Sequence, residues 1–213
     1  MARPKVALVI PAFNEAETIR SVVYGVIGYG VPVVVDDGSS DDTALIASEA
    51  GAIVVSHTTN RGYDAALNSG FKEALRQNCK ILITFDADGQ HSESLIDSFL
   101  VSIDDGADVV IGIRDRRARI SETLFSWVAS RRWKIQDPLC GMKAYRSEVY
   151  QSLGHFDSYG SIGTELCIFA SKNHFQIREI PFEVKERADN PRLGSIWSAN
   201  LKILRAMLLG ILT

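Results

Sequence analysis

Two carboxylates and an amide follow a short apolar run near the middle of the chain. Asp86, Asp88 and Gln90 come directly after residues 81–84, and Gly89 lies among them. Side chains two positions apart on an extended chain point to the same side, so Asp86 and Asp88 should project together where a strand ends. Carboxylate and amide oxygens are ligands of hard cations such as Mg²⁺ or Mn²⁺, which can hold a diphosphate. By itself this pattern is more often a solvated acidic turn, so its interpretation depends on the neighbouring segments.

Polar segments also follow two other predicted strands. Residues 11–15 (Pro-Ala-Phe-Asn-Glu) come after the apolar run 6–10, and residues 36–40 (Asp-Asp-Gly-Ser-Ser) come after 31–35. In parallel sheets, ligands bind beyond the carboxyl ends of the strands. We therefore expect the three polar segments to meet at one edge of a sheet.

The elements that must position these segments alternate between strand and helix. We expect Asn14 to cap the first helix. Such alternation with short connections predicts an α/β fold with a mainly parallel sheet and helices on both faces. The predicted strands are 6–10, 31–35, 52–56, 81–84 and 109–113, and the predicted helices are 16–24, 43–50, 64–77 and 94–103.

The second half is less regular. Residues 114–134 mix basic and aromatic side chains and are interpreted as a mobile loop with a short helix. Beyond it we expect a strand at 143–145, a helix from Ser147, a helix at 163–172 and an extended segment at 176–185. Nothing in this half resembles a nucleic-acid-binding motif, so nucleic acid is not an expected partner.

The last segment, residues 195–212, predicts an amphipathic helix. It is too short and too charged to span a bilayer. It could lie in the plane of a membrane interface, dock on the core or be buried in a homodimer. The expected polar side comprises Ser195, Ser198, Lys202 and Arg205, and the expected apolar side comprises Trp197, Leu201, Leu204, Leu208 and Ile211.

Charge is distributed unevenly in this chain of 213 residues with net charge −3. Residues 1–113 carry 7 Lys and Arg against 16 Asp and Glu, whereas residues 114–213 carry 16 against 10. An acidic half would bind an anionic ligand best through a metal ion, whereas a basic half can bind phosphate or a membrane surface directly. The three cysteines lack metal-site spacing and fit a reducing cytosol, and we expect no signal peptide. These features favour a cytoplasmic protein, peripheral on the membrane at most.

Five segments in order resemble the family 2 inverting glycosyltransferases of GT-A fold: residues 11–15, 35–43, 60–62, 86–91 and 137–143. Within that family they are most similar to the branch of dolichol-phosphate mannose synthase, which loads a sugar onto a polyprenyl phosphate. The resemblance covers nearly the whole chain. It implies one GT-A domain over residues 1–194, with a donor and metal half (1–113) and an acceptor half (114–194), followed by the helix 195–213.

The resemblance assigns roles on the donor side. Pro11, Phe13 and Glu15 would line the base and ribose pocket, and Asp37 would hydrogen-bond the base of a UDP- or GDP-linked sugar. Asp86 would face the ribose and sugar, and Asp88 and Gln90, with Asp86, would hold Mg²⁺ or Mn²⁺ on the diphosphate. The metal would offset charge on the departing nucleoside diphosphate. Asp36 is expected to be a structural turn residue.

The acceptor remains open between two chemistries. If it is a polyprenyl phosphate, the resemblance implies that Arg114, Arg187 and Arg192 hold the phosphate while Asp137 orders the site. If it is a saccharide hydroxyl, a general base is needed and Asp137 is the candidate.

The chain departs from the branch at three places. Ile196 stands where a Lys is common, Ser92 where Pro is usual, and Cys140 where Ser is frequent; we interpret Cys140 as a packing residue.

Two other classes of function are less well supported. A sugar nucleotidyltransferase usually has a Gly-rich basic loop after its first strand, which residues 11–15 do not provide. A non-catalytic nucleotide-sugar sensor would bind the donor without releasing free nucleotide, so turnover assays distinguish it.

Overall fold

Seven strands form one sheet in the order β3-β2-β1-β4-β6-β5-β7. The computed structural model describes residues 4–87, 94–116, 119–183 and 196–212. The strands are β1 (Val6–Ala12), β2 (Val31–Asp36), β3 (Ile53–Ser56), β4 (Ile81–Thr84), β5 (Val109–Arg114), β6 (Lys143–Arg146) and β7 (Ile177–Phe182). The helices are α1 (Ile19–Val26), α2 (Thr43–Glu49), α3 (Tyr63–Arg76), α4 (Ser94–Asp104), α5 (Ile120–Arg132), α6 (Ser147–Leu153), α7 (Glu165–Lys172) and α8 (Ile196–Leu212).

The central strands are almost continuous runs of Val, Ile and Leu because helices cover both faces of the sheet. Every residue of β4 is buried, as are six of the seven residues of β1. The pairs β1–β2, β1–β4, β2–β3 and β5–β7 are parallel, and β6 runs antiparallel between β4 and β5. The prediction of a mainly parallel sheet is therefore confirmed.

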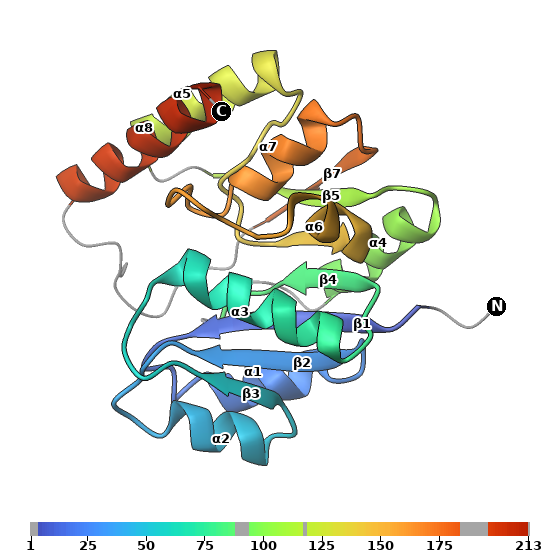
Figure 1. The fold of residues 1–213 in the computed structure, drawn as a ribbon, viewed down its shortest axis with the longest axis vertical. Helices are drawn as coiled ribbons and strands as arrows, with labels where there is room; N and C mark the ends of the chain where they lie inside the picture. The colour runs from blue at the N-terminus through green and yellow to red at the C-terminus, as the bar shows by residue number, and fades with distance from the viewer. Residues whose placement is uncertain (1–3, 88–93, 117–118, 184–195, 213) are drawn as a thin grey trace.

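The order of the strands creates a switch point between β1 and β4. The chain moves from β1 outward to β2 and β3, then returns past β1 to β4, which places α3 on the face opposite α1 (Figure 1). Gly70 lets α3 approach the sheet closely, since a Cβ there would lie 3.0 Å from Val35 Cγ2 and closer still to Val9 Cγ1. A crevice is expected where the carboxyl ends of β1 and β4 diverge.

The predicted cap of the first helix is wrong. Helix α1 begins at Ile19 with Thr18 as its N-cap residue, and Asn14 lies upstream with a positive φ of 54°. The Asn14 amide oxygen accepts a hydrogen bond from the Ser40 backbone N–H at 2.9 Å. Asn14 therefore joins two loops, because its side chain can support the left-handed conformation that most residues avoid.

The interpretation of residues 114–134 as a mobile loop with a short helix is also wrong. Helix α5 spans 13 residues and buries Phe125 and Ala129 in the core. It runs parallel to α8, because Ser121 Oγ contacts Asn200 Oδ1 near the start of both helices and Arg132 contacts the Ile211 carbonyl near their ends. The two helices lie side by side at one end of the molecule (Figure 1).

Helix α8 docks on the core through a different face from the one predicted. Its buried residues are Ala199, Ile203, Ala206, Met207 and Gly210, whereas Leu201 and Leu208 are exposed. The helix is apolar on more than one side, so spacing alone did not identify the docking face. None of the helices within the described ranges is long and apolar enough to cross a membrane.

Candidate active site

The loops after β1 and β2 are joined into one surface at the carboxyl edge of the sheet. The Asn14 backbone N–H donates to Ser39 Oγ at 2.9 Å, and the Glu15 N–H donates to Thr43 Oγ1 at 2.8 Å. The Asp37 N–H donates to the Ala12 carbonyl at 2.8 Å. These bonds bring the predicted donor segments 11–15 and 36–40 together.

Within this surface, Phe13 is exposed, Pro11 is half-buried and Glu15 is buried. Glu15 Oε2 accepts a hydrogen bond from Thr18 Oγ1 at 3.1 Å, which holds its carboxylate near the start of α1. Asp36 Oδ1 accepts from the Ser39 N–H at 3.1 Å, so the prediction that Asp36 is a turn residue is confirmed.

Asp37 is buried beneath the same surface and is held by the segment 57–62. Its Oδ1 receives His57 Nδ1 at 2.6 Å and the Arg61 N–H at 2.9 Å, and its Oδ2 receives the Gly62 N–H at 2.7 Å. The His57 ring also contacts Ser69 Oγ on α3 through Nε2 at 2.9 Å. The carboxylate is fixed by neutral donors and one histidine.

The end of β4 brings Asp86 against the segment that leads into β6. A Cβ on Gly141 would lie 3.0 Å from Asp86 Oδ1 and closer still to Oδ2, so only glycine permits this approach. Thr84 Oγ1 fixes the backbone on either side, donating to the Gly141 carbonyl at 2.6 Å and accepting from the Lys143 N–H at 2.9 Å. The predicted segments 86–90 and 137–143 therefore meet.

The predicted metal ligands Asp88 and Gln90 lie outside the described residues. Across the described ranges, no three His, Cys, Asp or Glu side chains come together in a way that could hold a metal. Asp86 is the described member of the predicted set. It lies just beyond the carboxyl end of β4.

Asp137 forms a buried ion pair with Arg114 at the end of β5. Arg114 Nε donates to Asp137 Oδ2 at 2.8 Å and a terminal N–H donates to Oδ1 at 2.9 Å, and Asp137 is fully buried. Burial alone lowers the pKa of Arg114, but the hydrogen bonds and charge of Asp137 raise it overall. Glu122 of α5 lies 3.5 Å from the same guanidinium. Arg187 and Arg192, the other predicted phosphate ligands, lie outside the described residues.

Cys140 lies in the same segment and is inert. Burial, followed by the charge of Asp137, raises the pKa of its thiol to about 12. A thiol with that pKa stays protonated at neutral pH, and the thiolate is the nucleophilic form. The interpretation of Cys140 as a packing residue is confirmed.

Sequence reasoning missed a loop that also borders the site. Residues 155–164 connect α6 to α7, and the buried Lys143 ammonium donates to the Gly163 carbonyl at 2.8 Å. Asp64 of α3 accepts from the Ile162 and Gly163 N–H groups at 3.1 and 2.6 Å. Burial, followed by the charge of Asp157, raises the pKa of Asp64 to about 6.

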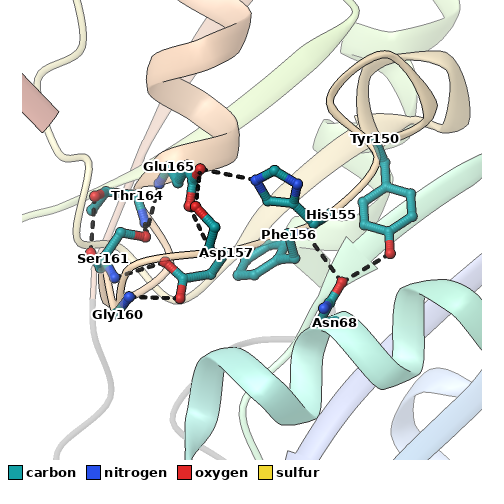
Figure 2. A network of polar contacts seen from close by, with 10 residues as sticks. Asn68, Tyr150, His155, Phe156, Asp157, Gly160, Ser161, Thr164 and Glu165 are labelled. Atoms are coloured by element: carbon teal, nitrogen blue, oxygen red, sulfur yellow. Dashed lines mark hydrogen bonds and ion pairs between the residues drawn. The ribbon is translucent and has the colours of Figure 1, made fainter. Parts of the chain in front are cut away.

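The same loop is held internally by two carboxylates (Figure 2). Asp157 accepts from the backbone N–H groups of Gly160 and Ser161, and Glu165 contacts His155 and Ser158. Asn68 of α3 connects to the loop through the Phe156 N–H, as Figure 2 shows. The contacts of Asp157 and Glu165 lie within the loop, whereas the contact of Asn68 joins segments 88 residues apart, which no motif in the sequence marks.

Comparison with known proteins identifies the family. A family model described as glycosyl transferase family 2 matches residues 7–163. The chain belongs to glycosyl transferase family 2. It is therefore an enzyme, a glycosyltransferase, as the sequence predicted.

Among its relatives in family 2, a polyprenol monophosphomannose synthase from Mycolicibacterium smegmatis is 32% identical over 205 residues, covering 84% of this chain and 77% of the relative. A dolichyl-phosphate hexose transferase from Haloferax volcanii is 31% identical over 202 residues, covering 88% of this chain and 86% of the relative. These names support the predicted polyprenyl-phosphate branch of family 2.

Solved structures establish the fold. A glucosyl-3-phosphoglycerate synthase from Mycobacterium tuberculosis, in complex with Mn²⁺, UDP and phosphoglyceric acid, superimposes with a TM-score of 0.79 at 22% identity. The match covers 97% of this chain and 78% of that one. At this identity the likeness concerns the fold alone, and it confirms the predicted GT-A architecture.

Proposed function

We propose that this chain transfers a hexose from a nucleotide diphosphate sugar to a polyprenyl phosphate, with inversion at the anomeric carbon. One observation carries the proposal: in a chain of family 2, the loops after β1 and β2 are hydrogen-bonded to each other, and β4, which precedes Asp86, lies beside β1. The names of relatives support the same acceptor class, and one relative from Methanococcus voltae is a UDP-N-acetylglucosamine–dolichyl-phosphate N-acetylglucosaminyltransferase, 26% identical over 217 residues.

The donor would lie across the carboxyl ends of β1, β2 and β4. In this proposal Pro11, Phe13 and Glu15 line the base and ribose pocket, and Asp37 binds the base. Asp86 faces the sugar, and Asp88 and Gln90, with Asp86, hold Mg²⁺ or Mn²⁺ on the diphosphate. The ion would neutralise charge on the leaving nucleoside diphosphate.

The state of Asp137 supports a phosphate acceptor over a hydroxyl acceptor. A general base must lie within hydrogen-bond reach of the proton that it removes, and a carboxylate paired with a cation is a weaker base. Both oxygens of Asp137 accept from Arg114, and the residue is fully buried. A phosphate oxygen is already ionised at neutral pH and needs no base. We therefore place the acceptor phosphate at the outer N–H groups of Arg114, together with Arg187 and Arg192, and assign Asp137 to positioning Arg114.

The surface of α5 and α8 supports presentation of the acceptor at a membrane. Ile120, Leu124 and Trp127 of α5 and Leu201 and Leu208 of α8 are exposed apolar residues on neighbouring parallel helices. The exposed charges on the described residues of these helices are all basic: Arg131, Arg132, Lys202 and Arg205. The Arg131 guanidinium stacks 4.0 Å above the Trp127 ring. Apolar side chains with a basic rim suit anionic lipid, which would make this a peripheral enzyme of the cytoplasmic membrane face.

The acceptor assignment is tested by offering labelled donor and Mn²⁺ with either a short polyprenyl phosphate or the matching polyprenol. We expect transfer to the phosphate only, reduced in Arg192→Ala and partly retained in Asp137→Asn. Transfer only to the alcohol, lost in Asp137→Asn, would replace the proposal with the hydroxyl acceptor. Donor turnover that releases free nucleotide also separates an enzyme from a sensor.

The metal assignment has its own test. Asp88→Asn keeps the size of the side chain but removes a charge and a hard ligand oxygen, so it should abolish transfer, as should excess chelator. Asp97→Asn, an exposed carboxylate on α4, is the matched control and should retain activity. Full activity of Asp88→Asn would contradict the proposed metal site.

The membrane assignment is tested with vesicles that contain anionic phospholipid. Leu201→Glu with Leu208→Glu should weaken binding to the vesicles, whereas Leu45→Glu, an equally exposed leucine on α2, should not. The wild type could instead form a dimer in solution. If Leu201→Glu with Leu208→Glu dissociates that dimer, the exposed face of α5 and α8 is a subunit interface.

A further inference from the structure

The side chains of Asp37, His57 and Ser69 form a hydrogen-bonded chain beneath the donor surface, and Ser69 is half-buried. His57 bridges Asp37 Oδ1 at 2.6 Å and Ser69 Oγ at 2.9 Å. The side chains of His57 and Asp37 are 5% and 6% exposed. His57 follows β3 directly, and its backbone N–H donates to the Asp36 carbonyl at 2.8 Å. Hydrogen bonds from the His57 backbone and at both ring nitrogens therefore fix the position of the ring.

The hydrogen bonds of Asp37 leave one position open. An ionised carboxylate only accepts, and each oxygen has room for about two donors. Oδ1 receives His57 and the Arg61 N–H, so it is filled. Among the described residues, Oδ2 receives the Gly62 N–H alone. An additional N–H donor would therefore be accepted at Oδ2.

The tautomer of His57 follows from these partners. Because the carboxylate accepts, Nδ1 carries the proton that it donates to Asp37. In the neutral ring Nε2 then accepts from the Ser69 hydroxyl. This arrangement prevents Asp37 from rotating, since rotation would break the bonds at Oδ1 and Oδ2 together.

We propose that His57 is a positioning residue that holds Asp37 so that Oδ2 accepts the ring N–H of the donor base, which restricts the donor to uracil, thymine or guanine nucleotides. The inference rests on the proposed function only in taking Asp37 as the residue that contacts the base. Uracil and thymine carry a proton on N3, and guanine carries one on N1. Cytosine and adenine present an unprotonated nitrogen at these positions, which would place a lone pair against the carboxylate.

Calorimetric titration tests the inference without requiring transfer. The probes are UDP, dTDP and GDP, each compared with CDP or ADP in the presence of Mn²⁺. We expect the wild type to prefer one of the first three by at least about tenfold, the scale of a charge-assisted hydrogen bond. In His57→Gln the amide lies nearer the position of Nε2, so this preference should fall about tenfold.

Two other variants separate positioning from general structural damage. His57→Asn places an amide N–H near the position of Nδ1, so it should restore most of the preference even though the contact with Ser69 is lost. His174→Asn changes an exposed histidine between α7 and β7 and should match the wild type. Asp37→Asn turns an N–H toward the base at the Oδ2 position, so it should reduce or invert the preference for UDP over CDP.

The outcomes distinguish this inference from the proposed function. If the wild type binds none of the diphosphates, the proposed donor chemistry fails. If it binds one selectively and both His57→Gln and Asp37→Asn retain the selectivity, the role of His57 is wrong while the proposed function stands. Should His57→Gln fail to fold, the comparison of His57→Asn with Asp37→Asn decides, because the first keeps the proposed contact and the second reverses it.

Discussion

The two halves of the molecule each bury a carboxylate at the carboxyl edge of the sheet, but they stabilise it differently. In the donor half, Asp37 accepts two backbone N–H groups and one imidazole nitrogen. In the acceptor half, Asp137 accepts two N–H groups from the Arg114 guanidinium and a third from the backbone of the same residue. In our proposal Asp37 also accepts from the donor base, whereas the charge of Asp137 is balanced by the Arg114 guanidinium that it orients.

Burial alone therefore does not define the role of a carboxylate. A guanidinium satisfies both oxygens and cancels the charge, so the pair acts as a structural unit. Backbone amides satisfy the oxygens singly and leave the charge in place, so the carboxylate can still recognise a proton donor. Substitutions that change the hydrogen bonds of one carboxylate at a time test this distinction.

The largest effect is expected from breaking the ion pair. Arg114→Ala leaves the Asp137 charge buried without its partner, which should lower the free energy of unfolding by about 3–5 kcal/mol in chemical denaturation. Arg178→Ala is the matched control, because its pair with Asp105 is largely exposed and should contribute under about 1 kcal/mol. An equal decrease in the free energy of unfolding in the two variants would mean that Arg114 and Asp137 do not form a buried ion pair.

Asp64 is a third carboxylate that accepts hydrogen bonds from backbone N–H groups. Its pKa is about 6 in the folded protein against 3.8 ordinarily, so the folded state retains a proton that the unfolded state releases. Stability should therefore fall as pH rises from about 4 to about 6, and change little from this group at higher pH. The difference between wild type and Asp64→Asn should amount to about 3 kcal/mol across that window.

Urea unfolding at pH 4 and pH 7 measures this difference, and subtracting the variant removes the contribution of other titrating groups. Asp97→Asn, on the surface of α4, should leave the pH dependence as in the wild type. Parallel profiles for wild type and Asp64→Asn would show that Asp64 ionises normally in the folded protein.

Gly141→Ala tests the contact between the two halves. The new methyl group would overlap Asp86, which must then move from the position in which we propose that it faces the donor. A displacement of about 1 Å can cost about 100-fold in kcat. Gly28→Ala is the control, because a Cβ at Gly28 meets nothing within 4 Å. Unchanged kcat in Gly141→Ala, measured as transfer to the preferred acceptor, would remove Asp86 from the reacting geometry.

The smallest effect is expected at Asp37. Asp37→Ala removes the acceptor for the base and should weaken donor binding by about 1–3 kcal/mol, with the metal-dependent part of the affinity intact. Calorimetry with the preferred nucleoside diphosphate measures the loss. A dissociation constant equal to that of the wild type would place the base pocket elsewhere.

The strands were predictable from the sequence because a parallel sheet buries both faces, so β1, β2 and β4 read as continuous apolar runs. Helix α5 was not predictable in this way. It buries Ser121, Glu122 and Ser126 while exposing Ile120 and Trp127, which reverses the usual pattern of an amphipathic helix. Glu122 lies beside Arg114 and Arg119, so charge pairing replaces hydrophobic burial there.

The candidate site was predictable up to the ends of the strands and no further. Position after a strand was enough to indicate residues 36–40 and Asp86, and the resemblance to family 2 then selected Asp37 over Asp36. The partners of these residues depend on pairings that no spacing encodes: His57 reaches Asp37 because the two residues follow the paired parallel strands β3 and β2, and Gly141 reaches Asp86 because β6 runs antiparallel to β4. The ion pair between Arg114 and Asp137 follows from the same reversal.

The reversed strand also has a consequence for how such enzymes could diversify. Neighbouring antiparallel strands such as β5 and β6 can be joined by a hairpin of two residues. Here the connection instead comprises residues 115–142 and includes α5. Because the pairing of β5 with β6 does not require this connection, its exposed part can change in length and sequence without altering strand order. If this connection contacts the acceptor, as we propose, relatives could differ in acceptor through changes here while β1, β2 and β4 stay the same.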